Sequence, residues 1–164
     1  MMLRMSQSVR PDMGAKLRAN DPGLNHVKAR AGIRNAGTLI VLAHLAVTMG
    51  HGSGHTHLGI GTNLWQTVFI AIVILAGPLI AMILLWTRMR RAAVLLLGVT
   101  MAGALLFGLY YHFIAPGADN ALEVGHSAWG TAFLVTSVLL AAIEAVACGW
   151  CFLVLRSRTI PNPT

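Results

Sequence analysis

Four long apolar stretches divide this chain, and they constrain its fold more than any other feature. They cover about residues 35–51, 64–86, 92–115 and 127–155, with short polar connections between them. A helix needs about 20 apolar residues to cross the hydrocarbon core of a bilayer, and the last three stretches reach that length. The first stretch is shorter and spans only with help from flanking residues. The pattern predicts an all-α integral membrane protein built as a four-helix transmembrane up-and-down bundle.

The composition supports this fold class and excludes a nucleic-acid partner. Hydrophobic residues make up 56% of the chain and charged residues only 10%, whereas soluble domains contain roughly 25% charged residues. The net charge of +7 would suggest nucleic acid in a soluble protein, but here the charges lie in short blocks between apolar stretches. The predicted partner is the lipid bilayer, with a larger membrane complex or a second copy of the chain as further candidates.

All twelve Lys and Arg residues lie on one side of the predicted bundle. Seven precede the first stretch, three separate the second from the third, and two follow the fourth, while the two opposite connections contain none. By the positive-inside rule both termini are cytoplasmic, and we expect a bacterial inner membrane. Residues 1–34 are then a basic, mostly disordered cytoplasmic tail, 35–156 the transmembrane domain, and 157–164 a short cytoplasmic tail.

A basic segment before a short apolar stretch is also typical of a cleaved signal peptide. The nearest resemblance to a cleavage site, at Thr48 and Gly50, is poor, and the basic segment is long for such a signal. The sequence therefore favours an uncleaved first span and leaves cleavage open as the alternative.

Five of the seven histidines lie on the side opposite the basic blocks. They are His51, His55, His57, His112 and His126. Three of them fall in the glycine-rich segment Met49–Gly59, which we expect to be a flexible loop that lets the rings converge. Neutral imidazole is the commonest metal-ligating side chain and suits copper and zinc. The sequence thus predicts a transition-metal site at the outer face. Three further residues there could orient ligands or complete the site, namely Asp119, Glu123 and Tyr111.

His44 and Glu144 are polar residues deep within predicted spans, where a charge costs about 2.5–3.5 kcal/mol. At the helical rise, His44 lies about 15 Å above Arg34 and Glu144 about 18 Å above Arg156, so their depths match. We expect a hydrogen-bonded pair inside the bundle. It is either a structural clamp or part of a proton or ion path toward His51.

No phosphate-binding loop, dinucleotide fingerprint, nucleophile elbow or haem-attachment motif is present in the sequence. The leading prediction is a non-enzymatic membrane protein that binds or handles copper or zinc, alone or as an accessory subunit. One alternative is a b-type haem electron carrier that uses His112 with either His51 or His126 as axial ligands. The other is a structural or assembly subunit whose histidines have no chemical role.

Overall fold

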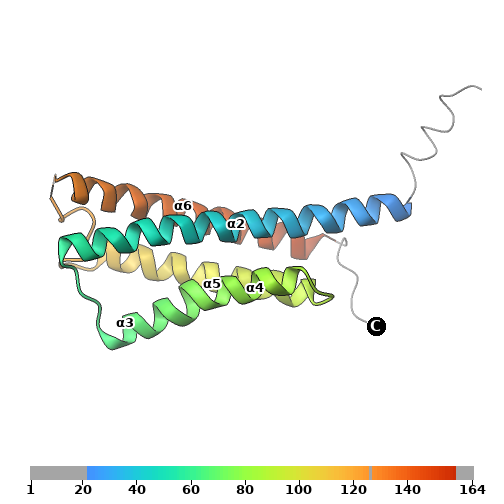
Figure 1. The fold of residues 1–164 in the computed structure, drawn as a ribbon, viewed down its shortest axis with the longest axis horizontal. Coiled ribbons are helices and arrows are strands. Elements are labelled where there is room, and N and C mark those ends of the chain that lie inside the picture. Colours follow the sequence, from blue (N-terminus) through green and yellow to red (C-terminus); the bar gives the residue numbers. More distant parts are fainter. Residues whose placement is uncertain (1–21, 126, 158–164) are drawn as a thin grey trace, which may run out of the picture.

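Four rods of helix, arranged side by side, make up the computed structural model, which describes residues 22–125 and 127–157. The elements are α2 (Pro22–Leu58), α3 (Leu64–Phe69), η1 (Ile70–Ala76), α4 (Gly77–Leu85), α5 (Arg90–Leu109), η2 (Tyr110–Ile114) and α6 (Ala128–Arg156). Helices α3, η1 and α4 form one rod, and α5 and η2 form another. Successive rods run in opposite directions (Figure 1). The described residues contain no strand.

Each rod contains a helix long and apolar enough to cross a membrane. The four candidate segments are Val27–Leu58, Leu64–Leu85, Arg90–Ile114 and Ala128–Arg156. The last three agree with the stretches expected from the sequence to within two residues at each end. The first is longer, because α2 begins at Pro22 inside the expected tail and runs past the expected end of the span.

The glycine-rich segment at the end of α2 is helical, so the expectation of a flexible loop there was wrong. The hydroxyls of Ser53 and Thr56 donate to carbonyls four residues earlier in the helix. At Gly54 the backbone lies so near α6 that a Cβ atom would be 3.2 Å from the Phe133 ring. Close packing against α6 therefore outweighs the low helix propensity of glycine. The helix ends only at Gly59, which takes a φ of 68° and allows Ile60 N–H to donate to the His55 carbonyl.

Helices α2 and α6 face each other along matching buried stripes. Their contacts follow one antiparallel register: Gly37 lies against Trp150, His44 against Glu144, and His51 against Thr136. Seven residues along α2, from His44 to His51, correspond to eight residues back along α6, from Glu144 to Thr136. This spacing of about two helical turns keeps the contacting residues on one face of each helix.

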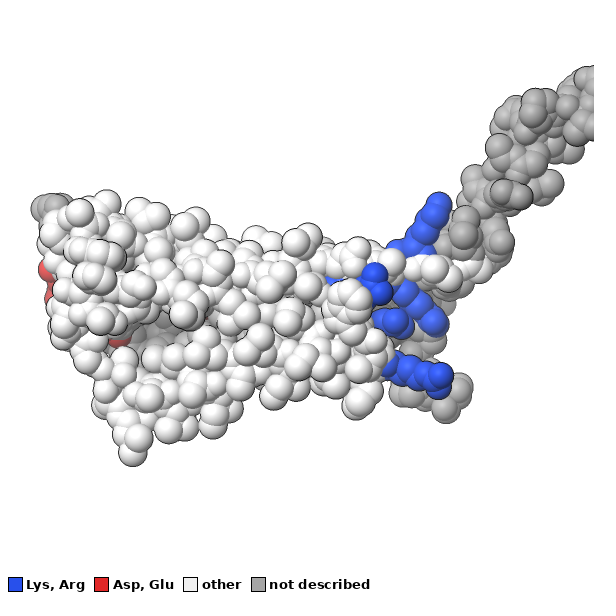
Figure 2. All heavy atoms as spheres, viewed as in Figure 1, with Lys and Arg blue, Asp and Glu red and all other residues white. Residues whose placement is uncertain are grey.

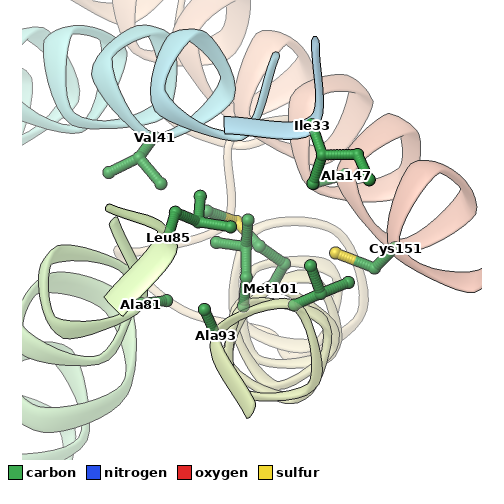
Figure 3. Close-up of a cluster of buried hydrophobic side chains, with 10 residues drawn as sticks. Ile33, Val41, Ala81, Leu85, Ala93, Met101, Ala147 and Cys151 are labelled. Carbon is green, nitrogen blue, oxygen red and sulfur yellow. The ribbon is translucent and has the colours of Figure 1, made fainter. Parts of the chain in front are cut away.

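The interior of the bundle divides into an apolar half and a polar half. The apolar half contains the main hydrophobic cluster: Ile33, Val41, Ala81, Leu85, Ala93, Val94, Leu97, Met101, Ala147 and Cys151. Figure 3 shows these side chains meeting between the four rods. The same end carries the described Lys and Arg residues, which Figure 2 shows gathered at one end of the molecule. We call it the basic end, and the opposite end the histidine end.

The second rod bends as it approaches the histidine end. Pro78 has no backbone N–H to donate, and the seven residues before Gly77 wind as a π-helix. Figure 1 shows α3 and η1 leaning away from α2, whereas α4 packs against it. The bundle is therefore tight at the basic end and opens toward the histidine end.

Close approach of α4 and α5 at Gly77 yields a stability prediction. A Cβ atom at Gly77 would collide with the Thr100 side chain, whose hydroxyl is held by the Leu96 and Leu97 carbonyls. We expect Gly77→Ala to destabilise the folded protein by about 1–3 kcal/mol. Unfolding of the purified protein in detergent, followed by circular dichroism against denaturant, measures the change.

Gly149→Ala is the matched control, because a Cβ atom there meets nothing within 4 Å. This substitution should be neutral or stabilising by up to about 1 kcal/mol, through helix propensity alone. Equal stability of the two variants would contradict the close approach at Gly77.

Candidate functional site

Three of the predicted histidines meet at the histidine end and form what we call the three-histidine cluster: His51, His55 and His112. One ring nitrogen from each lies within 4.8 Å of the others. The ring centroids are 4.9 Å apart for His51 and His55, and 4.7 Å for His51 and His112. His51 and His55 lie one turn apart on α2, and η2 supplies His112.

Phe133 of α6 forms the floor on which the three rings rest. The His51 ring stacks on it at 4.5 Å between centroids, and the other two rings meet it edge-on at 5.0 and 5.4 Å. Phe133 is fully buried. Packing against this buried ring limits the imidazoles to small rotations.

The hydrogen bonds of two rings determine which nitrogen carries a lone pair. Thr136 Oγ1 donates its proton to a carbonyl of its own helix, so His51 Nδ1 must donate in the 3.0 Å contact with Thr136. His112 Nδ1 likewise donates to the Asp119 carbonyl oxygen at 3.1 Å. In the neutral form of each ring, Nε2 then carries the lone pair, and a neutral imidazole with a free lone pair is what binds a metal.

Asp119 reaches the cluster from the connection after η2, which folds back over His112. Ala121 N–H donates to the His112 carbonyl oxygen, and the buried Asn120 amide donates to the Ala115 carbonyl oxygen. This places Asp119 Oδ1 3.2 Å from His112 Nδ1 and 3.4 Å from His55 Nε2. One carboxylate oxygen therefore faces two rings of the cluster.

The charge state of Asp119 follows from these neighbours. Burial by itself raises the pKa of the Asp119 carboxyl, but the adjacent His112, and then His55, lower it by more, so this pKa lies below its usual value. The carboxylate is ionised at neutral pH and puts a negative charge beside the rings. Its contribution to stability is present above about pH 4 and is lost as the pH falls further.

Two buried ring nitrogens of this site, His51 Nε2 and His55 Nδ1, have no hydrogen-bond partner among the described residues. Asp119 Oδ1 has only its two imidazole neighbours, at 3.2 and 3.4 Å. Buried polar groups are nearly always satisfied, and an unsatisfied one costs about 1–3 kcal/mol. Lone pairs converging within a buried cluster are the arrangement expected of a cation site.

The other predicted residues of this face that the structure describes lie away from the three-histidine cluster. His57 stacks on Trp129 at 3.7 Å between centroids, and its Nδ1 lies 2.9 Å from the Ser53 carbonyl oxygen. Tyr111 packs against Phe107, and Glu123 is exposed in the connection before α6. His126 lies outside the described residues.

The structure also brings together His44 and Glu144, the polar residues of matched depth. His44 Nε2 lies 3.1 Å from Glu144 Oε1, and the two residues are 0% and 4% exposed. One turn further along α2, Thr48 Oγ1 donates to the His44 carbonyl at 2.8 Å. Each side chain thus gives the other a polar partner inside the bundle.

Two residues that support the site could not be identified from the sequence pattern. Thr136 orients His51, but a threonine in an apolar stretch is ordinary. Asn120 secures the connection that carries Asp119 and bonds to Leu122 N–H as well. Only the tertiary contacts reveal either role.

No protein-family model, curated protein or solved structure matches this chain. The function must therefore be argued from the geometry of the site.

The His44–Glu144 contact gives a second stability prediction. Glu144→Ala removes the only polar partner that the described residues give the His44 ring, and we expect a loss of about 1–3 kcal/mol. Glu144→Gln keeps a hydrogen-bond acceptor and should cost less. Denaturant unfolding in detergent measures both, and Gly149→Ala again serves as the control on α6. Unchanged stability of Glu144→Ala would show that the contact contributes nothing.

Proposed function

We propose that this chain is a multi-pass membrane protein that binds a transition metal, zinc or copper, at the three-histidine cluster. The observation that carries the proposal is the convergence of His51, His55 and His112 within 4.8 Å, beside the ionised Asp119. It is a binding function without catalysis by this chain alone. The protein acts by itself or as an accessory subunit of a larger membrane complex.

The membrane location is supported by the surface of the bundle. Large apolar side chains are exposed along all four rods, for example Leu39, Ile72, Val99 and Val146 at 62–69%. Lipid tails, or helices of a partner, would cover them. The Lys and Arg residues at the basic end support cytoplasmic termini in a bacterial inner membrane, which puts the three-histidine cluster at the outer face.

The donor atoms favour a metal of intermediate softness. Three imidazole nitrogens suit both zinc and copper(II), and no thiolate is near to favour copper(I). Zinc–nitrogen bonds of about 2.0–2.1 Å place the nitrogens of tetrahedral ligands about 3.3 Å apart. Small rotations of the three rings would bring their nitrogens from within 4.8 Å to that separation. Asp119 would balance the charge and hold His112, and one coordination position would stay open to water or another donor.

The geometry favours a metal ion over a haem held by His51 and His112, while the other haem pairing, His112 with His126, involves a residue outside the described ones. A haem iron takes its two axial ligands on opposite faces of a flat macrocycle. Here the centroids of the His51 and His112 rings are only 4.7 Å apart. His55 and Asp119 crowd the same place, with His55 Nε2 3.4 Å from Asp119 Oδ1. These side chains leave no room between His51 and His112 for the flat ring of a haem.

Metal titration tests the proposal directly. We expect the detergent-solubilised protein to bind zinc and copper(II) with one site per chain, measured by calorimetry. His55→Ala and His112→Ala should each weaken binding roughly 100-fold or more, since each removes a ligand. Thr136→Val and Asp119→Asn should weaken it about 10–100-fold, because both disturb residues that orient ligands.

His57→Ala is the matched control, because that ring stacks on Trp129 outside the cluster. Its affinity should equal that of the wild type. Binding should also weaken below about pH 6, where protons compete with the metal for imidazole. Equal affinity in the wild type, His55→Ala and His112→Ala would remove the metal-site proposal.

Cysteine labelling tests the orientation. Single cysteines at the exposed positions Ser53 and Ala118, in a chain that has Cys148→Ala and Cys151→Ala, should react with an impermeant maleimide added to intact cells. A cysteine at the exposed Thr87, in the connection at the basic end, should react only after lysis. The reverse pattern would overturn the orientation while leaving metal binding untouched.

A further inference from the structure

A cavity of about 410 Å³ lies within the polar half of the bundle, next to the three-histidine cluster. Helices α2, η1, α5, η2 and α6 all contribute to its wall. The cluster and Asp119 occupy its end toward the histidine end, and Glu144 lies in its wall deep in the bundle. Pockets for small organic molecules typically measure about 300–1,000 Å³, so this cavity is large enough for one.

The cavity is closed toward the basic end. On α6 the lining residues begin at Ser137 and end at Glu144, and the next buried side chains toward the basic end are Ala147 and Cys151. Both belong to the apolar cluster that fills that half of the bundle (Figure 3). A cavity closed by a packed apolar core is suited to holding a molecule rather than to passing an ion across.

The splayed second rod gives the cavity a side entrance. Ile70 and Ile74 of η1 line one edge, and Gly52 and Thr56 of α2 line the other. Figure 1 shows α3 and η1 diverging from α2 here, and Figure 2 shows a hollow between them on the same face. The π-helical winding of η1 contributes to this divergence, and such segments are frequent at functional sites. In the membrane that we propose, the entrance faces lipid.

Below the three-histidine cluster, the wall combines aromatic and aliphatic surfaces with two buried polar groups, the Glu144 carboxyl and the Ser137 hydroxyl, which already donates to the Phe133 carbonyl. Phe107 is held in place by stacking on Phe69 at 4.7 Å between centroids, and Ile74 and Leu140 also line the cavity. Glu144 is 4% exposed, and one of its oxygens faces His44. The carboxyl group has two oxygens, so a further donor can be accepted from within the cavity. Burial against these apolar residues would cost a charged ligand much free energy, whereas a neutral ring whose one hydroxyl is hydrogen-bonded would pay far less.

We propose that this cavity binds a bilayer-soluble phenol, hydroquinones included, whose hydroxyl donates a hydrogen bond to Glu144. The aromatic ring packs against Phe107 and the isoleucines of η1, in the offset or edge-on arrangements that aromatic pairs prefer. This inference rests on the membrane location proposed above but not on bound metal. It can therefore fail while metal binding holds, and the reverse is also true.

Binding of 4-hexylphenol to metal-free protein in phosphatidylcholine nanodiscs tests the proposal. Calorimetry, corrected with empty nanodiscs, should show saturable binding of one molecule per chain. Hexylbenzene has the same ring and tail without the hydroxyl, and it should bind at least about tenfold more weakly, because it cannot donate to the second Glu144 oxygen. Glu144→Gln should weaken 4-hexylphenol binding about tenfold, because the amide has one acceptor oxygen where the carboxyl has two, and His44 already occupies one.

A matched pair of glycine variants tests the location. Gly108 lines the cavity, and a Cβ atom there would meet only His112, at 3.8 Å, so Gly108→Leu has room to fill the space. This variant should abolish saturable binding. Gly149→Leu, at an open position on α6, should leave binding unchanged.

Photolabelling locates the ligand in the wild-type chain without any variant. A phenol carrying a diazirine should label Ile74 or Leu140, and excess 4-hexylphenol should prevent this labelling. Partitioning that never saturates, equal affinity for hexylbenzene, or labelling confined to residues outside the cavity would each overturn the proposal.

Discussion

The contact between His44 and Glu144 sets the register on which the rest of the structure depends. Burying either side chain alone would cost free energy, because each would lose its hydrogen bonds to water. Pairing them at 3.1 Å ties α2 to α6 near the middle of both helices. The register then brings His51 opposite Thr136 and Gly54 opposite Phe133. The three-histidine cluster is in this sense a consequence of a contact two turns away.

The division of the interior into two halves gives the molecule a rigid part and an open part. Small and aliphatic residues let the four rods approach closely near the basic end, as at Gly77 beside Thr100. Toward the histidine end, the second rod winds as a π-helix before Gly77 and diverges from α2 (Figure 1). A packed base thus holds the positions from which the site residues project, which is what a preorganised site requires.

Metal binding and the cavity, as proposed here, use different atoms of one polar interior. The three-histidine cluster and Asp119 offer nitrogen and oxygen donors at the outer end. Glu144 offers a hydrogen-bond acceptor deeper in the bundle, among apolar walls. Both sites depend on α2 staying helical through a glycine-rich segment, since a loop there would not hold His51 and His55 against Phe133.

The sequence by itself determined the number of apolar helices and most of their bounds, because helical spans require long apolar stretches and these are visible in any one chain. It also indicated that His44 and Glu144 share a depth, since helical rise converts residue number into height.

The sequence did not show that residues 49–58 are helical, because local propensity favours a loop and only packing against α6 overrides it. It could not separate His51, His55 and His112 from His57, since which face of α2 is buried depends on its partners. The tertiary structure alone decided those points, along with the roles of Thr136 and Asn120 and the existence of the cavity, because contacts between distant segments leave no periodic trace in the chain.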